Sequence, residues 1–247
     1  MTAALIARDI RKSFGGFKAV DGVDLTIEEG GRRAVIGPNG AGKTTFFNLL
    51  TGMMKPDAGA VSIGGHEVTA LPPHRIAGLG VTRAFQLTSI FGRLTVMRNV
   101  QVALMVSAGM TTRIWGSSWS EKVDEARAIL EEVGLADLAE IPASTVSHGD
   151  QRALELAIAL AGDPKLLILD EPTAGMAPAE TRRTMELIRR IIGERGITLL
   201  FSEHDMDVVF DTADLITVMY QGRILVEGTP EEVRGNAKVQ EVYLGGP

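Results

Sequence analysis

The hydrophobic positions in the first third of the chain form short runs that are typical of β-strands. Residues 5–10 and 20–27 are two such runs, separated by a Phe-Gly-Gly-Phe turn at 14–17 and closed by a glycine turn at 28–31. Short runs bounded by turn residues indicate strands rather than helices. We therefore expect residues 4–36 to be mostly β structure. Further β-prone runs follow at 33–36, 60–63 and 81–85.

Helical spacing replaces these short runs in residues 87–163. Residues 96–105 are apolar and predict a helix, and residues 107–120 form a polar loop that holds both tryptophans and for which we expect a surface position. A second apolar stripe then recurs at helical intervals until the stop at Gly134, through Val123, Ala126, Leu130 and Val133. This spacing predicts a helical subdomain inserted into the rest of the chain.

Two continuous apolar runs in the last third predict strands that are buried on both faces. Residues 166–169 run directly into Asp170 and Glu171, and residues 197–201 precede a Ser-Glu-His-Asp segment. Continuous apolar runs are typical of parallel strands covered by helices on both sides. A hairpin is then expected, with strands at 215–219 and 223–227.

The segment between the strand at 33–36 and the next helix carries the clearest chemical signal. Its sequence, GPNGAGKTT, fits the phosphate-loop pattern G-x-x-x-x-G-K-[ST] in the strand–loop–helix context that this pattern requires. Glycines turn backbone N–H groups toward a phosphate, and the helix N-terminus favours the negative charge. We expect Lys43 to reach the β- and γ-phosphates and Thr44 to ligate Mg²⁺. The residues expected to bind the nucleotide here are Gly37, Pro38, Asn39, Gly40, Ala41, Gly42, Lys43, Thr44 and Thr45.

These features predict a single α/β domain over residues 1–247. A P-loop NTPase core with a mainly parallel sheet, together with an N-terminal antiparallel β subdomain, is expected from residues 1–86 and 164–247. The helical subdomain is expected from residues 87–163.

Ionisable groups at the ends of buried strands are costly unless a metal or a reacting group meets them. With a phosphate loop upstream, Asp170 is interpreted as the Mg²⁺-directed carboxylate and Glu171 as the group that polarises the attacking water. Three other residues are ambiguous when taken alone. Phe14 fits sheet packing as well as base stacking, Ser147 fits a simple helix N-cap, and His204 fits a structural role.

Composition limits the class of protein. The 247 residues carry a net charge of −6, with a pI of about 5.3, which disfavours a nucleic-acid partner because such proteins usually present a basic face. The chain has no cysteine, which fits a reducing compartment. No apolar run approaches the roughly 18 residues that span a bilayer, and charges near the N-terminus disfavour a signal peptide. We expect a cytoplasmic protein that reaches a membrane only through partners.

In chain order the features are Phe14, the phosphate loop, Gln86, a helical insert, Ser147-x-Gly149, Asp170-Glu171 and His204. Over nearly its whole length the chain resembles the nucleotide-binding subunits of ATP-binding-cassette (ABC) transporters. The resemblance implies ATP and Mg²⁺ as cofactors. It also implies that Phe14 stacks on adenine, and that Gln86 contacts Mg²⁺ and the attacking water and couples the site to a membrane subunit.

The same resemblance assigns the downstream residues. Ser147, Gly149 and Asp150 belong to a signature motif that, in this family, closes over the ATP held by a second subunit. Asp170 follows as the metal-directed acid, with Glu171 as catalytic base and His204 as the contact to the γ-phosphate. The implied partners are a second ABC ATPase subunit, in a homodimer or heterodimer, integral membrane permease subunits and, indirectly, a periplasmic solute-binding protein. The implied location is the cytoplasmic face of the inner membrane.

Local sequence points to one branch of this family. The segments 82–86, 147–155, 174–180, 203–206 and 242–245 are similar to those of ATPases from bacterial branched-chain amino-acid importers. Two residues depart from the general family pattern. His148 replaces the commoner glycine of the signature, a change that this branch often shows. Ala177 stands where an Asp or Asn is usual and cannot make its hydrogen bond between the two ATP sites, so we expect altered communication between sites and intact hydrolysis.

Other functions remain as alternatives. Importers of urea, other amides or hydrophobic amino acids share much of the pattern, and lipopolysaccharide-export ATPases share the Tyr-Leu-Gly ending. A soluble cassette ATPase of DNA repair or translation usually has a second cassette or a coiled-coil insert. A P-loop kinase leaves Ser147-His148-Gly149 and His204 without a role. The sequence does not reveal the transported solute.

Overall fold

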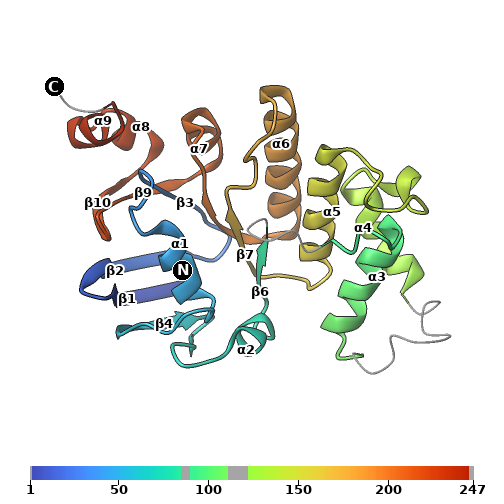
Figure 1. Ribbon diagram of the computed structural model, residues 1–247, viewed down its shortest axis with the longest axis horizontal. Coiled ribbons are helices and arrows are strands. Elements are labelled where there is room, and N and C mark those ends of the chain that lie inside the picture. Colours follow the sequence, from blue (N-terminus) through green and yellow to red (C-terminus); the bar gives the residue numbers. More distant parts are fainter. Residues whose placement is uncertain (1, 85–89, 111–121, 245–247) are drawn as a thin grey trace.

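The computed structural model describes residues 2–84, 90–110 and 122–244, and its N-terminal part is a four-stranded antiparallel sheet (Figure 1). The strand order is β2-β1-β4-β5. The two long strands extend beyond the apolar runs that predicted them because polar residues of β1 continue the pairing as far as Phe14 opposite Phe17. The strands of this sheet are β1 (Ala3–Phe14), β2 (Phe17–Glu28), β4 (Ala58–Ile63) and β5 (His66–Glu67).

A second, six-stranded sheet forms the centre of the molecule. Its order is β10-β9-β3-β8-β7-β6, with parallel pairing from β9 to β6 and an antiparallel β9–β10 hairpin at the edge. Parallel strands bring their carboxyl ends to one edge, so the segments that follow β3, β7 and β8 lie close together. The strands are β3 (Arg32–Ile36), β6 (Val81–Ala84), β7 (Leu166–Asp170), β8 (Thr198–Ser202), β9 (Leu215–Tyr220) and β10 (Arg223–Gly228).

Two hydrophobic cores lie on the two faces of the central sheet. Helix α1 (Lys43–Leu50) fills the space between the two sheets, where Phe46 and Phe47 are fully buried with residues from both. The other face is covered by α6 (Pro178–Arg195) and α7 (Met206–Thr212), which stand above the sheet in Figure 1. Three short helices lie around the two sheets: α2 (Pro73–Ala77) packs in the core on the α1 side, and α8 (Pro230–Arg234) and α9 (Ala237–Leu244) pack in the core on the α6 side.

Helices occupy the described part of residues 87–163, at the right of Figure 1. They are α3 (Val96–Ser107), α4 (Val123–Glu132), a 3-10 turn (Ala136–Leu138) and α5 (His148–Leu160). Their apolar faces join the core on the α6 side of the sheet. Where the domain divides, at 86/87 and at 163/164, stays a prediction. The loop predicted at 107–120 lies largely outside the described residues.

Candidate functional site

The phosphate loop is held in a shape that only glycine permits at two positions. Gly37 and Gly42 both have positive φ, of 153° and 103°. A Cβ on Gly37 would lie 2.2 Å from the carbonyl oxygen of Met219, and one on Gly42 would lie 2.3 Å from that of Ala19. The loop is therefore packed directly against the backbone of β9 and β2, and this packing fixes the N-terminus of α1.

Lys43 is buried at the start of α1 and folds back over the loop. Its Nζ donates hydrogen bonds to the carbonyl oxygens of Gly37, at 2.6 Å, and Pro38, at 3.3 Å. Burial lowers the pKa of the Lys43 ammonium below its usual value, and the charges of Glu171 and Asp170 partly offset this effect. A desolvated cation without a carboxylate in direct contact is suited to receive an anionic ligand.

The beginning of α1 offers unused hydrogen-bond donors. Gly42 is its N-cap residue and supplies no side-chain cap. The first backbone N–H groups of a helix have no partner within the helix, and together with the helix dipole they bind phosphates. Loop shape, Lys43 and this helix end all fit the predicted triphosphate.

Asp170 ends β7 with both carboxylate oxygens engaged. The Ser202 hydroxyl donates to Oδ1 at 2.7 Å, and Arg83 Nη2 donates to Oδ2 at 2.8 Å. Within the described residues there is no group of three or more His, Asp or Glu side chains that could enclose a metal. Mg²⁺ at nucleotide sites needs only one or two protein ligands beside the phosphates, so Thr44 and Asp170 are a sufficient donor set.

Glu171 and His204 meet at the ends of neighbouring strands. His204 Nε2 lies 2.8 Å from Glu171 Oε1, and both side chains remain partly open to solvent. The backbone of Glu171 is left-handed, with φ of 53°, and its N–H donates to the carbonyl oxygen of Ser202 at 3.1 Å. A left-handed non-glycine residue is strained and is frequently found at functional sites. The structure therefore brings together the predicted base and the predicted histidine.

Two residues that sequence reasoning left without a role support this pair. Glu203 is buried, and its Oε1 accepts hydrogen bonds from the Thr173 N–H at 2.9 Å and hydroxyl at 2.6 Å. Its Oε2 accepts from the His204 N–H at 3.0 Å. Glu203 thus ties the loop after Glu171 to the backbone of His204. The sequence signal that could have identified Glu203 is its position, as a charged residue between a buried strand and a candidate histidine.

The signature residues form a local turn at the start of α5. Ser147 is the N-cap, as the pattern predicted, and its hydroxyl accepts from the Asp150 N–H at 3.2 Å and donates to the Asp150 carboxylate at 2.6 Å. Gly149 lies between them, where a Cβ would come no nearer than 3.9 Å to the Ser147 hydroxyl. This turn belongs to the helical region rather than to the loop at 37–45, and Asp150 serves it as a capping partner.

Phe14 and Gln86 were also predicted to belong to the site. Phe14 stands at the end of β1 with its side chain exposed, 47% by area, and the Lys12 Nζ lies 5.8 Å from its ring centre. An exposed ring there is free to stack, and its contact with adenine stays a prediction. Gln86 lies outside the described residues.

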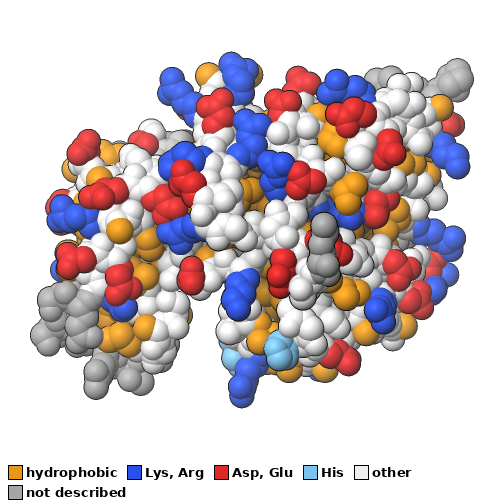
Figure 2. All heavy atoms as spheres, turned by 180° about the vertical axis from the view of Figure 1, so that it is seen from behind, with side chains coloured by type: hydrophobic (Ala, Val, Ile, Leu, Met, Phe, Trp, Pro, Cys, Tyr) orange, Lys and Arg blue, Asp and Glu red, His pale blue; other side chains and the backbone are white. Residues whose placement is uncertain are grey.

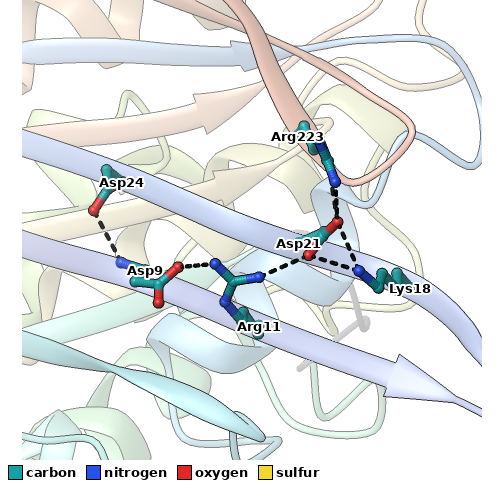
Figure 3. Close-up of polar contacts among 6 residues, drawn as sticks. All are labelled: Asp9, Arg11, Lys18, Asp21, Asp24 and Arg223. Atoms are coloured by element: carbon teal, nitrogen blue, oxygen red, sulfur yellow. Dashed lines mark hydrogen bonds and ion pairs between the residues drawn. The ribbon is translucent and has the colours of Figure 1, made fainter.

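A polar cluster around Asp21 links β1, β2 and β10 (Figure 3), and two backbone hydrogen bonds continue from Asp21 to the phosphate loop. The Asp21 N–H donates to the carbonyl oxygen of Gly222 at 2.8 Å, and the Gly222 N–H donates to that of Ala41 at 3.0 Å. The buried Asp21 carboxylate accepts hydrogen bonds from Arg11, Lys18 and Arg223. Sequence reasoning gave none of these side chains a role.

A groove separate from the phosphate loop runs between the β structure and the helical region. Its volume is about 1100 Å³, and it is visible in Figure 2 as a hollow at the lower edge. Phe91 and Val106 line it and are about half exposed. Its walls also carry charged side chains and two histidines: Glu29, His66, His74, Asp163 and Lys165. Among the described helices, none has the length and apolar character to cross a membrane.

The phosphate loop, the two acids at the end of β7, the histidine after β8 and the inserted helices together define an ATP-binding cassette. The chain belongs to the ABC transporter family, which matches residues 20–174. A second family, described as the branched-chain amino acid ATP-binding cassette transporter, matches residues 223–247. The predicted family and fold class are thereby confirmed.

Relatives place the chain within this family. It is 41% identical over 239 residues to the high-affinity branched-chain amino acid transport ATP-binding protein BraF of Pseudomonas aeruginosa, covering 94% of each chain. It is 40% identical over 248 residues to LivG of Salmonella typhimurium, a protein with the same description, covering 98% of this chain and 97% of LivG.

Solved structures agree with this placement. The ADP conformation of MJ1267, an ATP-binding cassette of an ABC transporter, matches with a TM-score of 0.90 and 32% identity, covering 99% of this chain and all of that one. The dimeric MJ0796 cassette bound to ADP and Pi matches with a TM-score of 0.77 at 24% identity, covering 92% of this chain and 98% of that one, a likeness of fold.

Proposed function

We propose that this chain is the ATP-hydrolysing subunit of an importer for branched-chain amino acids or related compounds. The observation that carries the proposal is the Glu171–His204 pair, which stands at the same sheet edge as the phosphate loop. The names of BraF and LivG, two relatives matched over nearly their full lengths, support the substrate class. They give no support to a lipopolysaccharide exporter, a soluble cassette ATPase or a kinase.

Residues of the phosphate loop and the start of α1 bind the nucleotide in this proposal. The N–H groups at the start of α1 receive the phosphates, and Lys43 exchanges its contacts with Gly37 and Pro38 for phosphate oxygens. Thr44 and Asp170 would hold Mg²⁺, which neutralises phosphate charge when bound. Phe14 would stack on the adenine ring.

Hydrolysis requires a water in line with the γ-phosphate. Glu171 accepts a hydrogen bond from that water and orients it, and His204 holds the carboxylate through the 2.8 Å contact and contacts the γ-phosphate. Gln86 is proposed to contact the same water. Glu203 holds the backbone of His204 at a fixed position relative to the loop after Glu171.

The complete site needs two subunits. Ser147 and Gly149 sit on the helical region, and the hydrogen bonds of Ser147 stay within its own turn. We propose that these residues close over ATP held by a second ABC subunit, identical or related. An isologous dimer of this kind contains two equivalent sites.

The groove beside the helical region is the proposed contact with a membrane permease. A hollow with exposed Phe91 and Val106 suits an apolar helix from a partner protein. Thr82 and Phe91, which both line it, flank the segment 85–89 that contains Gln86. The chain would then work at the cytoplasmic face of the inner membrane, with a periplasmic binding protein delivering solute to the permease.

The experiment that tests the two-subunit site starts from the Glu171→Gln variant. With ATP present, this variant is expected to double in mass by light scattering, because ATP is held between the subunits and not consumed. Adding Ser147→Arg should abolish the mass increase while fluorescent ATP still binds the monomer. Adding Glu131→Arg on the exposed face of α4 is the control and should leave the dimer intact. A dimer that persists with Ser147→Arg would contradict the proposed role of the signature turn.

The solute class is tested in the assembled transporter. Reconstituted with its permeases and binding protein, the complex should hydrolyse ATP faster when the binding protein carries leucine, isoleucine or valine. Equal rates with and without these amino acids would contradict the substrate assignment and leave the ATPase assignment untouched.

A further inference from the structure

Arg83 is a part-buried arginine in β6 that contacts Asp170, the proposed metal-directed acid. Its guanidinium donates to Asp170 Oδ2 at 2.8 Å and to the side-chain oxygen of Asn48 at 2.6 Å. It also lies over the ring of Phe47, 5.8 Å from the ring centre. The arginine therefore bridges strand β7, which carries Asp170, and helix α1, which follows the phosphate loop.

The fork geometry of arginine explains this arrangement. A planar guanidinium can hold two acceptors at fixed angles and stack on an aromatic face at the same time, whereas a lysine ammonium acts as a single point charge. Asn48 and Phe47 fix the orientation of Arg83, and Arg83 in turn fixes that of Asp170. The side chains of Arg83 and Asp170 are only 12% and 6% exposed, so hydrogen bonds to water contribute little to the orientation of Asp170.

The charge of Asp170 needs this partner. A buried carboxylate is costly when it is unpaired, and removal of one member of a buried pair leaves the other uncompensated. Ser202 occupies Oδ1 and Arg83 occupies Oδ2, so the carboxylate has one orientation before any nucleotide arrives. Partners that orient a metal ligand in this way affect metal affinity about 10- to 100-fold.

We infer that Arg83 is a positioning residue for Asp170 and that it sets the affinity of the nucleotide complex for Mg²⁺. This inference rests on the proposed role of Asp170 as the metal-directed acid. The hydrogen bonds that Arg83 makes in the described structure go to Asn48, Thr51 and Asp170. None of them goes to the loop at 37–45, so binding of the nucleotide without metal should not depend on Arg83.

The test compares binding of a fluorescent, non-hydrolysable ATP analogue in EDTA and in saturating Mg²⁺. The dissociation constant in EDTA divided by that in Mg²⁺ measures how much more tightly the bound nucleotide holds Mg²⁺ than the free nucleotide does. For Arg83→Met we expect the ratio to fall by about tenfold or more, with binding in EDTA within about twofold of wild type. Arg83→Lys keeps a cation beside Asp170 but loses the fork, so its ratio should lie between the two.

A matched control comes from the same sheet. Arg33 in β3 is also shielded from water, with its side chain 6% exposed, and forms an ion pair with Glu227 at 2.7 Å rather than with Asp170. Arg33→Met should lower thermal stability and leave the ratio at the wild-type value. If Arg83→Met cannot be purified folded, Arg83→Lys carries the test.

Two results would overturn the inference. The first is a wild-type ratio in Arg83→Met, or in Arg83→Lys where that variant carries the test; if binding with and without Mg²⁺ falls equally, the ratio is also unchanged and Arg83 is structural only. The second is a higher ratio, which would mean that the guanidinium chiefly repels the metal. A ratio of one in the wild-type protein would instead contradict the magnesium role of Asp170 itself.

Discussion

His204 Nε2 lies 2.8 Å from Glu171 Oε1, across the ends of the adjacent parallel strands β7 and β8. The contact joins a carboxylate on a strained, left-handed backbone to an imidazole whose own backbone is held by Glu203. Glu171 and His204 come just after β7 and β8, so their separation depends both on the register that pairs Asp170 with Ser202 and on the backbone that follows each strand. A water-orienting carboxylate needs this kind of rigid support.

The first prediction concerns Glu171, the proposed base. Glu171→Gln keeps the shape of the side chain and an oxygen that can face His204, but it removes the negative charge that accepts a proton from water. We expect kcat for ATP hydrolysis to fall about 100-fold or more, with ATP binding retained. Phosphate release and nucleotide affinity, measured on the same preparation, check this. Wild-type turnover would remove Glu171 from the role of base.

The second prediction concerns the histidine. His204→Ala leaves the Glu171 carboxylate without its partner at 2.8 Å. We expect kcat to fall roughly 10- to 100-fold while KM changes little, because the contact is needed for orientation in the transition state. His66→Ala, in the separate groove, is the control and should hydrolyse ATP normally in the isolated subunit. A higher KM with an unchanged kcat would instead indicate that His204 acts in ATP binding alone.

The third prediction concerns Lys43. Burial of its ammonium lowers its pKa below 10.5. Between the lowered pKa and 10.5 the unfolded chain binds more protons than the folded one, so the free energy of unfolding rises with pH there. Lys43→Met lacks this contribution. Its free energy of unfolding should equal or exceed that of wild type near neutral pH, and the difference should shrink at alkaline pH.

The same Lys43→Met variant should bind ATP about 10- to 100-fold more weakly, the size of one charge-assisted hydrogen bond or somewhat more. Chemical unfolding at several pH values and nucleotide titration check the two halves separately. A variant that is less stable than wild type at neutral pH would show that the contacts to Gly37 and Pro38 outweigh the desolvation of the ammonium.

The fourth prediction separates backbone strain from steric contact in the phosphate loop. Gly40 and Gly42 both have positive φ, but only at Gly42 would a Cβ meet another atom, the carbonyl oxygen of Ala19 at 2.3 Å. Gly40→Ala should cost roughly 1–2 kcal/mol of stability from strain alone. Gly42→Ala should cost roughly 3 kcal/mol or more, because the backbone of β2 must also move. Thermal unfolding without nucleotide tests the order, and equal costs would contradict it.

Local sequence was sufficient for the phosphate loop because its glycines, lysine and flanking elements are all within one short segment. Asp170 and Glu171 were predictable because a buried apolar strand ends in two charges. The role of Arg83 was not predictable, because it depends on β6 pairing with β7. That pairing brings Arg83 to Asp170, which is 87 positions away in sequence. Glu203 shows the same limit, because its partner Thr173 comes from another strand end. Pairings between distant strands are set by topology, which periodicity does not encode.

The last prediction concerns Asp21, which ties β2 to the β9–β10 turn beside the phosphate loop (Figure 3). The hydrogen bond from Arg223 lowers the pKa of Asp21 below 3.8, and Lys18 adds to the effect. A carboxylate whose pKa is lowered in the folded state stabilises the protein above its unfolded pKa, and this contribution is lost as pH falls through the folded value. Asp21→Asn should therefore be less stable than wild type at about pH 6, and the difference should shrink toward about pH 3. Asp24→Asn, on the same strand, lacks the contact with Arg223 and is the comparison. Urea unfolding at each pH measures both variants, and a difference for Asp21→Asn that does not change with pH would show that the ion pairs contribute nothing to it.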